Sequence, residues 1–200
     1  MPYRKTKLIA SILIVIITMT IFIGCKAKEE VVAPTYEPGI LTEDSFESEW
    51  LNIKFTLPED ARLLSRSDID NAMNTSTEQV TESNIVEMIA IEGVGFPQVV
   101  LMVEKRPTTI TNAADYIAAL ERDIVNAQLE CETTAAKETV EIAGQSYTVL
   151  YASIVTQGSE MLQTYYCRVQ EDKVVSIVLS CSKGTEEKAE KMIDGFSVIK

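Results

Sequence analysis

The stretch YTVLYASIVTQGSEMLQTYYCRVQEDKVVSIVLSC, residues 147–181 of this 200-residue chain, decides the fold class. It holds three runs rich in Val, Ile, Leu and Tyr, a composition typical of β-strands. Together with a shorter run just before them, they predict strands over residues 139–142, 147–156, 161–170 and 173–181. The expected turns are Ala143-Gly144-Gln145-Ser146, Gln157-Gly158-Ser159 and Glu171-Asp172. Such short connections favour a four-stranded antiparallel meander.

Helical patterns flank this meander on both sides. Between residues 113 and 129 the apolar residues recur at spacings of three and four, at Ala113, Ile117, Leu120, Ile124 and Ala127. Asn112 with Asp115 resembles the capping signal of that helix. Thr185 is the expected cap of a second helix over residues 186–194, which Gly195 ends.

The segment before the long helix also predicts strands. Trp50, Ile53, Phe55 and Leu57 indicate one or two strands within residues 46–57. Two further apolar runs, 85–91 and 99–105, are separated by Gly93, Gly95 and Pro97, so we expect an antiparallel pair. The polar residues 67–84 between these regions are compatible with a short helix or a loop.

The order of these elements predicts one α+β domain over residues 46–200, an antiparallel sheet flanked by helices. Two segments of this domain resemble the Mog1/PsbP-like fold, an α/β/α sandwich. They are its opening, Trp50-Leu51-Asn52-Ile53-Lys54-Phe55-Thr56-Leu57-Pro58, and its ending, Met192-Ile193-Asp194-Gly195-Phe196-Ser197-Val198-Ile199. That superfamily includes photosystem accessory proteins, a binder of a nuclear transport GTPase and bacterial envelope lipoproteins. The resemblance implies a non-catalytic interaction module, and it transfers no binding residues.

The N-terminus has the layout of a secretory signal. Arg4, Lys5 and Lys7 precede an apolar run over residues 8–23. The following stretch Phe22-Ile23-Gly24-Cys25 resembles the lipobox of bacterial lipoproteins, although Phe22 stands where that family most often has Leu. We therefore expect residues 1–24 to be a signal peptide and Cys25 to be lipidated. An uncleaved transmembrane helix is the alternative, but the apolar run of 16 residues is shorter than the roughly 20 that span a bilayer.

Residues 25–45 carry prolines and glycine without sustained periodicity, so we expect a flexible tether behind the lipidated cysteine. Two or more fatty acyl chains, palmitate among them, hold a protein durably at a bilayer. The expected location is the extracytoplasmic face of the cell membrane. The membrane, reached through the lipid anchor, is then one partner of the chain.

Composition excludes several function classes. The formal net charge is −12 and falls to −15 if residues 1–24 are removed with their three basic side chains, which opposes binding to nucleic acid and anionic headgroups. Histidine is absent, which removes the commonest general base near neutral pH. The sequence shows no phosphate-binding loop, nucleophile elbow or H-E-x-x-H motif. We therefore expect no enzyme and no cofactor.

The remaining cysteines are Cys131, Cys167 and Cys181, and an exported chain could form one disulfide among them. If Glu171-Asp172 is a two-residue turn, Cys167 lies opposite Ser176 and Cys181 opposite Leu162, about 17 Å apart. Bridged Cα atoms lie within about 7 Å, so this register opposes a bridge between Cys167 and Cys181. Packing as small apolar residues is the preferred interpretation.

The candidate metal ligands and the tyrosines can also be explained by ordinary structural roles. Asp68-Ile69-Asp70-Asn71 resembles the start of a calcium loop, but Met73 and Gln79 replace its required Gly and Glu. The acidic residues Glu43, Asp44, Glu47 and Glu49 are best explained as a solvated face, and we predict no metal. Four tyrosines on the meander are expected to pack on the sheet, with a recognition surface as the alternative: Tyr147, Tyr151, Tyr165 and Tyr166.

These observations favour a membrane-anchored interaction domain. We expect it to contact another envelope protein or a small ligand through its sheet or through residues 67–84. The alternative is an accessory or stabilising subunit of a membrane complex. An enzyme of unrecognised type would need a deep pocket with convergent carboxylates.

Overall fold

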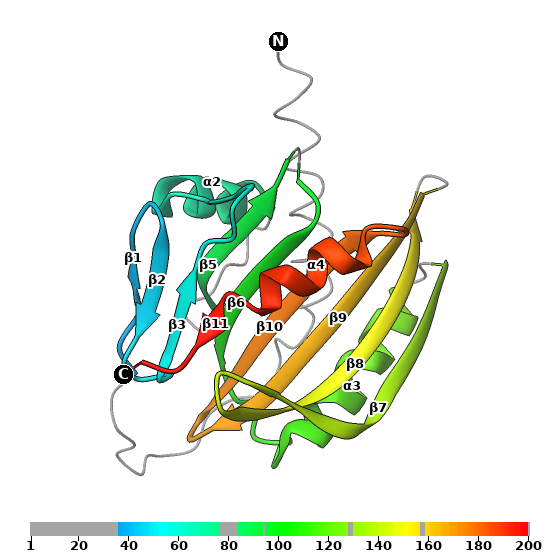
Figure 1. Cartoon of the computed structure of the whole chain (residues 1–200). Coiled ribbons are helices and arrows are strands. Elements are labelled where there is room, and N and C mark those ends of the chain that lie inside the picture. The colour runs from blue at the N-terminus through cyan, green and yellow to red at the C-terminus, as the bar shows by residue number, and fades with distance from the viewer. Residues whose placement is uncertain (1–35, 77–83, 94, 128–129, 157–158, 200) are drawn as a thin grey trace.

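A computed structural model describes residues 36–76, 84–93, 95–127, 130–156 and 159–199. Its centre is a seven-stranded antiparallel sheet in the order β4-β5-β6-β10-β9-β8-β7 (Figure 1). These strands are β4 (Ala61–Leu63), β5 (Asn84–Glu92), β6 (Gln98–Lys105), β7 (Glu130–Ile142), β8 (Gln145–Thr156), β9 (Ser159–Gln170) and β10 (Lys173–Ser182). A four-stranded antiparallel sheet joins β1 (Ile40–Leu41), β2 (Ser45–Ser48), β3 (Ile53–Thr56) and β11 (Phe196–Ser197).

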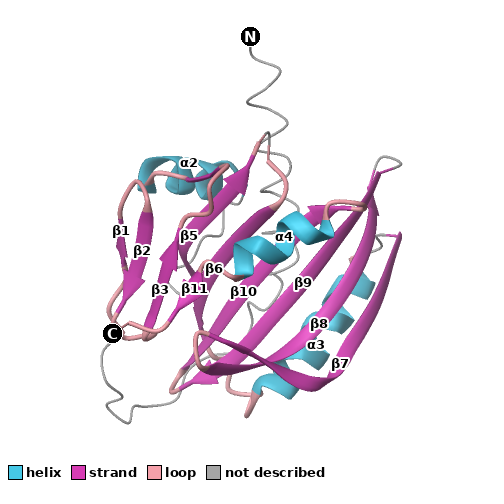
Figure 2. Ribbon diagram, viewed as in Figure 1, coloured by secondary structure: helices cyan, strands magenta, loops and turns pink. Residues whose placement is uncertain are grey.

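Helices cover both faces of the large sheet (Figure 2). The helices α2 (Arg66–Ser76) and α3 (Ala113–Asn126) pack on one face, where their apolar residues share a core with β5, β6, β8, β9 and β10. The helix α4 (Glu186–Ile193) and the four-stranded sheet pack on the other face and share a second core. The predicted α+β fold, an antiparallel sheet flanked by helices, is confirmed. None of the helices in the described ranges is both long and apolar enough to cross a bilayer.

The expected meander is present as β7 to β10. At the β7–β8 turn, Ala143 and Gly144 both have positive φ angles, 50° and 67°, as a two-residue hairpin turn of type I′ requires. The strand β7 begins at Glu130 instead of residue 139. The sequence pattern misses this first part because its Glu132 and Thr134 are exposed to solvent, so the apolar signal of a strand is weak there.

The long helix also follows the sequence pattern. The Asn112 side chain accepts a hydrogen bond from the N–H of Asp115 at 3.0 Å and so caps α3 as expected. The expected side-chain cap of α4 is not formed. The Thr185 hydroxyl donates to the main-chain oxygen of Ser182 and makes no hydrogen bond to the helix. Of the polar segment 67–84, the first part is helical in α2, and residues 77–83 lie outside the described ranges.

The folded part of the chain begins earlier than the expected boundary at residue 46. Tyr36 packs edge-on against Trp50, with ring centroids 5.1 Å apart. Gly39 donates its N–H to Oε2 of Glu87 at 3.0 Å, and β1 pairs with β2. The last ten residues of the expected tether are therefore part of the domain, whose β2–β3 hairpin offers them a strand edge and an aromatic contact. Residues 25–35 lie outside the described ranges.

Candidate functional site

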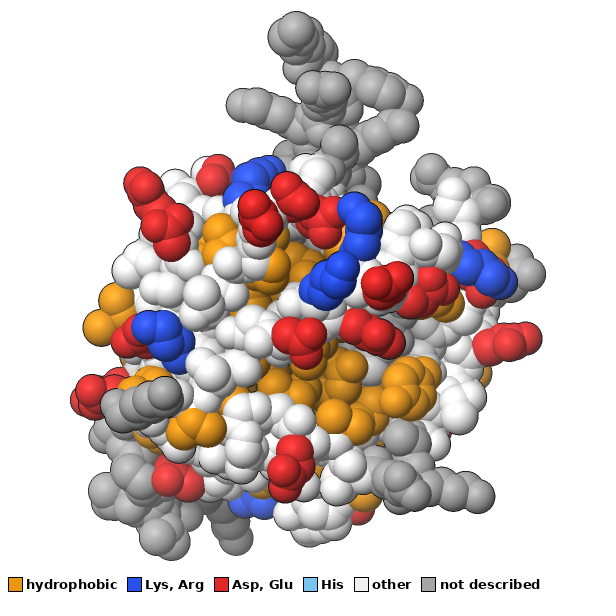
Figure 3. Space-filling view, viewed as in Figure 1, with side chains coloured by type: hydrophobic (Ala, Val, Ile, Leu, Met, Phe, Trp, Pro, Cys, Tyr) orange, Lys and Arg blue, Asp and Glu red, His pale blue; other side chains and the backbone are white. Residues whose placement is uncertain are grey.

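A groove lies on the sheet face that carries α4. Its volume is about 420 Å³, and we call it the α4 groove. Its lining residues are Glu132, Thr134, Tyr151, Ala152, Ser153, Leu162, Gln163, Thr164, Tyr166, Leu179, Cys181, Glu186, Ala189 and Glu190. In Figure 3 an apolar patch lies beside α4 over β8 to β10, with acidic side chains at its border.

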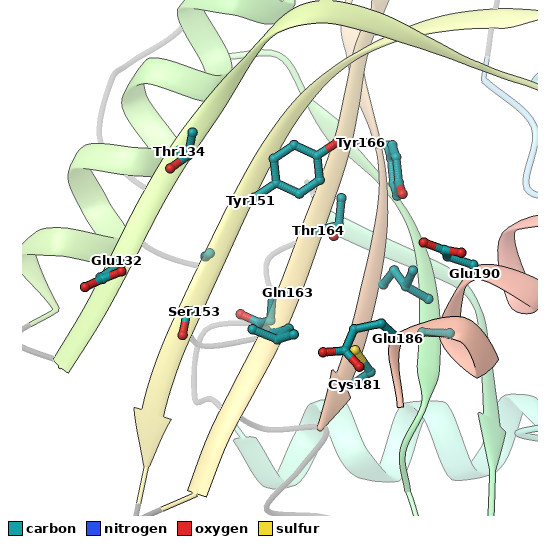
Figure 4. A pocket seen from close by; sticks show the side chains of 14 residues that line it. Glu132, Thr134, Tyr151, Ser153, Gln163, Thr164, Tyr166, Cys181, Glu186 and Glu190 are labelled. Carbon is teal, nitrogen blue, oxygen red and sulfur yellow. The ribbon is translucent and has the colours of Figure 1, made fainter. Parts of the chain in front are cut away.

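The alternation of side chains along β8 and β9 determines which residues form the floor of the groove. Side chains of β8 and β9 point alternately to the two faces, so Leu150 and Tyr165 enter the core beneath α3. Their neighbours Tyr151 and Tyr166 lie on the opposite face and form the floor with Thr164 (Figure 4). Tyr151 remains 47% exposed.

The helix α4 forms one wall of the groove. Ala189 and Met192 are buried and fasten the helix over the sheet. Since residues four apart lie on the same face of a helix, Glu186 and Glu190 both border the groove. The opposite border is β7, where Glu132 and Thr134 face the same side of the sheet.

The carboxylates and tyrosines of the groove influence one another. The pKa of Glu186 is lowered, chiefly by a main-chain hydrogen bond from Gly184, so this carboxylate is ionised at neutral pH. Burial raises the pKa of Tyr166 to about 12, and the charge of Glu190 contributes to this shift. Glu160 accepts a hydrogen bond from Lys183 Nζ at 2.7 Å and another from the lining residue Ser153 at 2.9 Å, and both lower the pKa of that carboxyl group. The groove is therefore anionic at neutral pH, and Tyr166 is a neutral phenol.

The cysteines behave as the register predicted. Cys167 lies opposite Ser176, and Cys181 lies opposite Leu162. All three described cysteines are free thiols. Cys167 is fully buried, its Sγ atom is 3.5 Å from Ser176 Oγ, and burial raises its pKa to about 12. Cys181 lies under α4, where burial and the neighbouring Glu186 raise its pKa, so neither thiol is poised as a nucleophile.

The tyrosines divide between the buried core and the lining of the groove. Tyr147 and Tyr165 are fully buried, which fits packing on the sheet. Tyr151 and Tyr166 line the groove instead. Among the described residues, no group of three His, Cys, Asp or Glu side chains is arranged to hold a metal ion.

Two buried carboxylates outside the groove have no counterpart in the sequence analysis. Burial raises the pKa of Glu87 to about 7, partly offset by the N–H of Gly39. Burial also raises the pKa of Glu104 to about 7, partly offset by a hydrogen bond with Tyr116. In each carboxyl group the Oε1 atom is buried and has no hydrogen-bond partner in the described residues. Glu87 interrupts the apolar run 85–91, and Glu104 follows the apolar run 99–103, so a charge within or beside an apolar run is the only sequence signal.

The lipidation motif predicted at Phe22, Ile23, Gly24 and Cys25 lies outside the described residues. The acidic groove residues Glu132, Glu186 and Glu190 were not singled out from the sequence. The spacing of Glu186 and Glu190 was a usable signal, because it places both on one side of the final helix. Nothing local shows that this side borders an uncovered part of the sheet.

No family model matches the chain, and no curated protein matches it in sequence. Among solved structures it is similar to cyanobacterial PsbP (CyanoP) from Synechocystis sp. PCC 6803, with 12% identity, a TM-score of 0.48 and coverage of 84% of this chain and 99% of that one. A protein from Bacteroides thetaiotaomicron has 12% identity and a TM-score of 0.44, over 80% of this chain and 50% of that one. LpqN of Mycobacterium tuberculosis, involved in cell envelope biogenesis, has 11% identity and a TM-score of 0.41, over 74% of this chain and 83% of that one. We take no residue role from these matches.

Proposed function

We propose that this chain is a lipid-anchored extracytoplasmic lipoprotein whose domain is a non-catalytic interaction module that binds its partner in the α4 groove. The observation that carries this proposal is the groove itself. Two tyrosines lie in a hollow between α4 and β7, and one of them, Tyr151, is left about half exposed. Aromatic side chains in a hollow with a polar border are a common feature of recognition surfaces.

The chemistry of the lining favours binding over catalysis. A nucleophile needs an adjacent base or a lowered pKa, whereas the pKa of Cys181 is raised. The lining holds no histidine and no basic side chain that would stabilise a developing negative charge. The groove residues can therefore hold a partner, but they do not form an acid, base and nucleophile set.

The lipid anchor is proposed from the sequence pattern around Cys25, and it is tested by metabolic labelling in the native host. A fatty acid analogue should label the wild-type chain and fail to label Cys25→Ser. Cys131→Ser is the matched control and should be labelled normally, since its thiol lies in the folded domain. Equal labelling of Cys25→Ser, or an unlabelled wild type, would remove the anchor from the proposal.

The groove is tested by site-specific photocrosslinking in intact cells. A photoreactive amino acid replaces Thr164 on the groove floor, and a second variant carries it at Arg122, which is exposed on α3 across the sheet. We expect a discrete adduct from position 164 that is absent from position 122. Adducts from position 122 alone would place the interaction surface elsewhere. A partner recovered in constant ratio to the chain would favour the alternative role of accessory subunit in a membrane complex.

A further inference from the structure

The borders of the α4 groove carry three carboxylates, and the charge of Lys183 acts on one of them, Glu186, without a direct ion pair. Glu132 lies on the β7 side and Glu186 with Glu190 on the α4 side, and the lining contains no Lys or Arg. None of these three carboxylates makes an ion pair within 4.0 Å in the described part of the chain. The lysines nearest to them in sequence are paired elsewhere: Lys183 with Glu160, Lys188 with Glu92 and Lys191 with Glu187.

The floor between these borders suits the hydrocarbon stems of basic side chains. Lys and Arg lay their methylene groups along apolar surface and place their charge near aromatic faces. The same chain has such contacts elsewhere: the guanidinium carbon of Arg168 lies 5.5 Å from the ring centroid of Tyr147, and Lys173 Nζ lies 5.9 Å from that of Tyr36. In the groove, Tyr151 and Tyr166 offer aromatic rings without a basic residue among the lining side chains.

The spacing of the carboxylates favours a chain segment over a single small amine. The helix α4 contacts β10, and β7 is three strands further along the sheet. At about 4.8 Å per strand, the two borders are about 14 Å apart. One ammonium group cannot reach both borders. Residues four apart in an extended peptide are separated by about 13 Å, so two basic side chains at that spacing can.

We propose that the α4 groove binds an extended basic segment of a partner protein, with Lys or Arg side chains pairing with Glu132 on one border and with Glu186 and Glu190 on the other. Their stems lie over Tyr151 and Tyr166. This inference rests on the proposed function, because it names the chemistry of the partner that the groove receives.

The test is a titration of the full chain in detergent, followed by NMR, with the peptide acetyl-Thr-Lys-Thr-Ser-Thr-Lys-Thr-amide. We expect weak binding with shifts confined to groove residues such as Thr164 and Ala189, and weaker binding as salt is raised. The same peptide with Glu in place of Lys should not bind. A third probe, lysine amide at equal charge concentration, should bind at least about threefold more weakly, since it meets one border only.

Matched variants distinguish binding in the α4 groove from nonspecific attraction to the acidic surface of the chain. Glu186→Gln, Glu190→Gln and Glu132→Gln should each weaken the Lys peptide about two- to fivefold. Glu187→Gln and Glu141→Gln remove the same charge outside the groove lining and should leave affinity unchanged. Equal thermal melting temperatures show that all five variants are folded.

The inference is overturned by equal binding of the acidic peptide, by equal weakening in the control variants, or by lysine amide binding as tightly as the peptide. Absence of any shift in the groove overturns it as well. If position 164 still crosslinks to a partner in cells, the proposed function stands while the basic segment is rejected. If that crosslink is also absent, both fail.

Discussion

Arg168 on β9 donates a hydrogen bond from Nη2 to the main-chain oxygen of Leu51, which lies 117 residues earlier in the chain, at 3.2 Å. Its Nε donates to the hydroxyl of Tyr147 at 3.1 Å. Next to this contact, the Gln170 amide donates to the main-chain oxygen of Trp50 at 2.7 Å. Polar contacts from the large sheet therefore hold the loop between β2 and β3, and with it the four-stranded sheet.

Replacing this guanidinium should destabilise the domain strongly. Arg168→Met retains most of the side-chain volume but leaves the Leu51 oxygen and the Tyr147 hydroxyl without their donor in a buried site. We expect a loss of about 2–4 kcal/mol in the free energy of unfolding, measured by urea denaturation. Arg122→Met, at a side chain that is 68% exposed, is the control and should change stability by less than about 0.5 kcal/mol. Equal effects of the two would show that the contact contributes little.

Glu104 should make stability depend on pH. Its pKa is about 7 in the folded domain and 4.5 as a model value, because burial disfavours the charge. The folded state therefore keeps a proton that the unfolded state releases, so the free energy of unfolding falls as pH rises from about 4.5 through about 7. The slope is at most about 1.4 kcal/mol per pH unit for one group.

Glu104→Gln should flatten this pH dependence in urea denaturation between about pH 4 and pH 8, a range that includes both pKa values of the carboxyl group. Part of the slope should remain, because burial also raises the pKa of Glu87 to about 7. The double variant with Glu87→Gln should be flatter still. An unchanged slope in Glu104→Gln would show that this carboxyl group is ionised at little cost in the folded domain.

The three described cysteines should differ in reactivity. In a Cys25→Ser background, the half-buried Cys131 should react first with a thiol reagent near neutral pH. Cys167 should react only as fast as the domain unfolds, because it is fully buried and its pKa is raised to about 12. Mass spectrometry after timed labelling checks the order. Rapid labelling of Cys167 in the folded chain would contradict its burial, and a disulfide between Cys167 and Cys181 would contradict the β9–β10 register.

Gly195 should tolerate no side chain. A Cβ atom there would lie 2.7 Å from the main-chain oxygen of Thr56 and 2.8 Å from the ring of Phe55. Gly195→Ala should therefore lower stability by about 2 kcal/mol or more, since main-chain atoms must move. Gly184→Ala is the comparison, with a φ of 90° but open space around it, and it should cost about 1 kcal/mol. Thermal melting of both variants distinguishes steric overlap from backbone strain.

Local signals were sufficient for much of the fold. Turn residues and apolar runs defined the hairpins, and the Glu171-Asp172 turn alone was enough to place Cys167 opposite Ser176. Asn112 marked the start of α3 because a helix cap depends on neighbouring residues only. The first part of β7 was missed because an edge strand with exposed polar side chains has no apolar pattern to detect.

The candidate site depended on contacts that no local pattern contains. Whether Tyr151 lies in the core or on a groove floor depends on how far α4 extends over the sheet, and α4 is formed by residues more than 30 positions later. The sequence showed four tyrosines on one meander, and strand alternation places Tyr147 and Tyr151 on the same face of the sheet. It could not show that Tyr147 is covered by packing whereas Tyr151 stays exposed.

The sequence by itself determined most strands of the large sheet, the long helix, the α+β class and the strongly acidic character of the chain. These follow from side-chain periodicity, turn chemistry and charge, which act over a few residues or sum over the whole chain. Only the tertiary structure decided that β6 pairs with β10, that Arg168 reaches Leu51, and that Glu132 faces Glu186 and Glu190 across an uncovered part of the sheet. Such relationships join residues far apart in sequence, and they form only when packing of the two apolar cores brings those residues together.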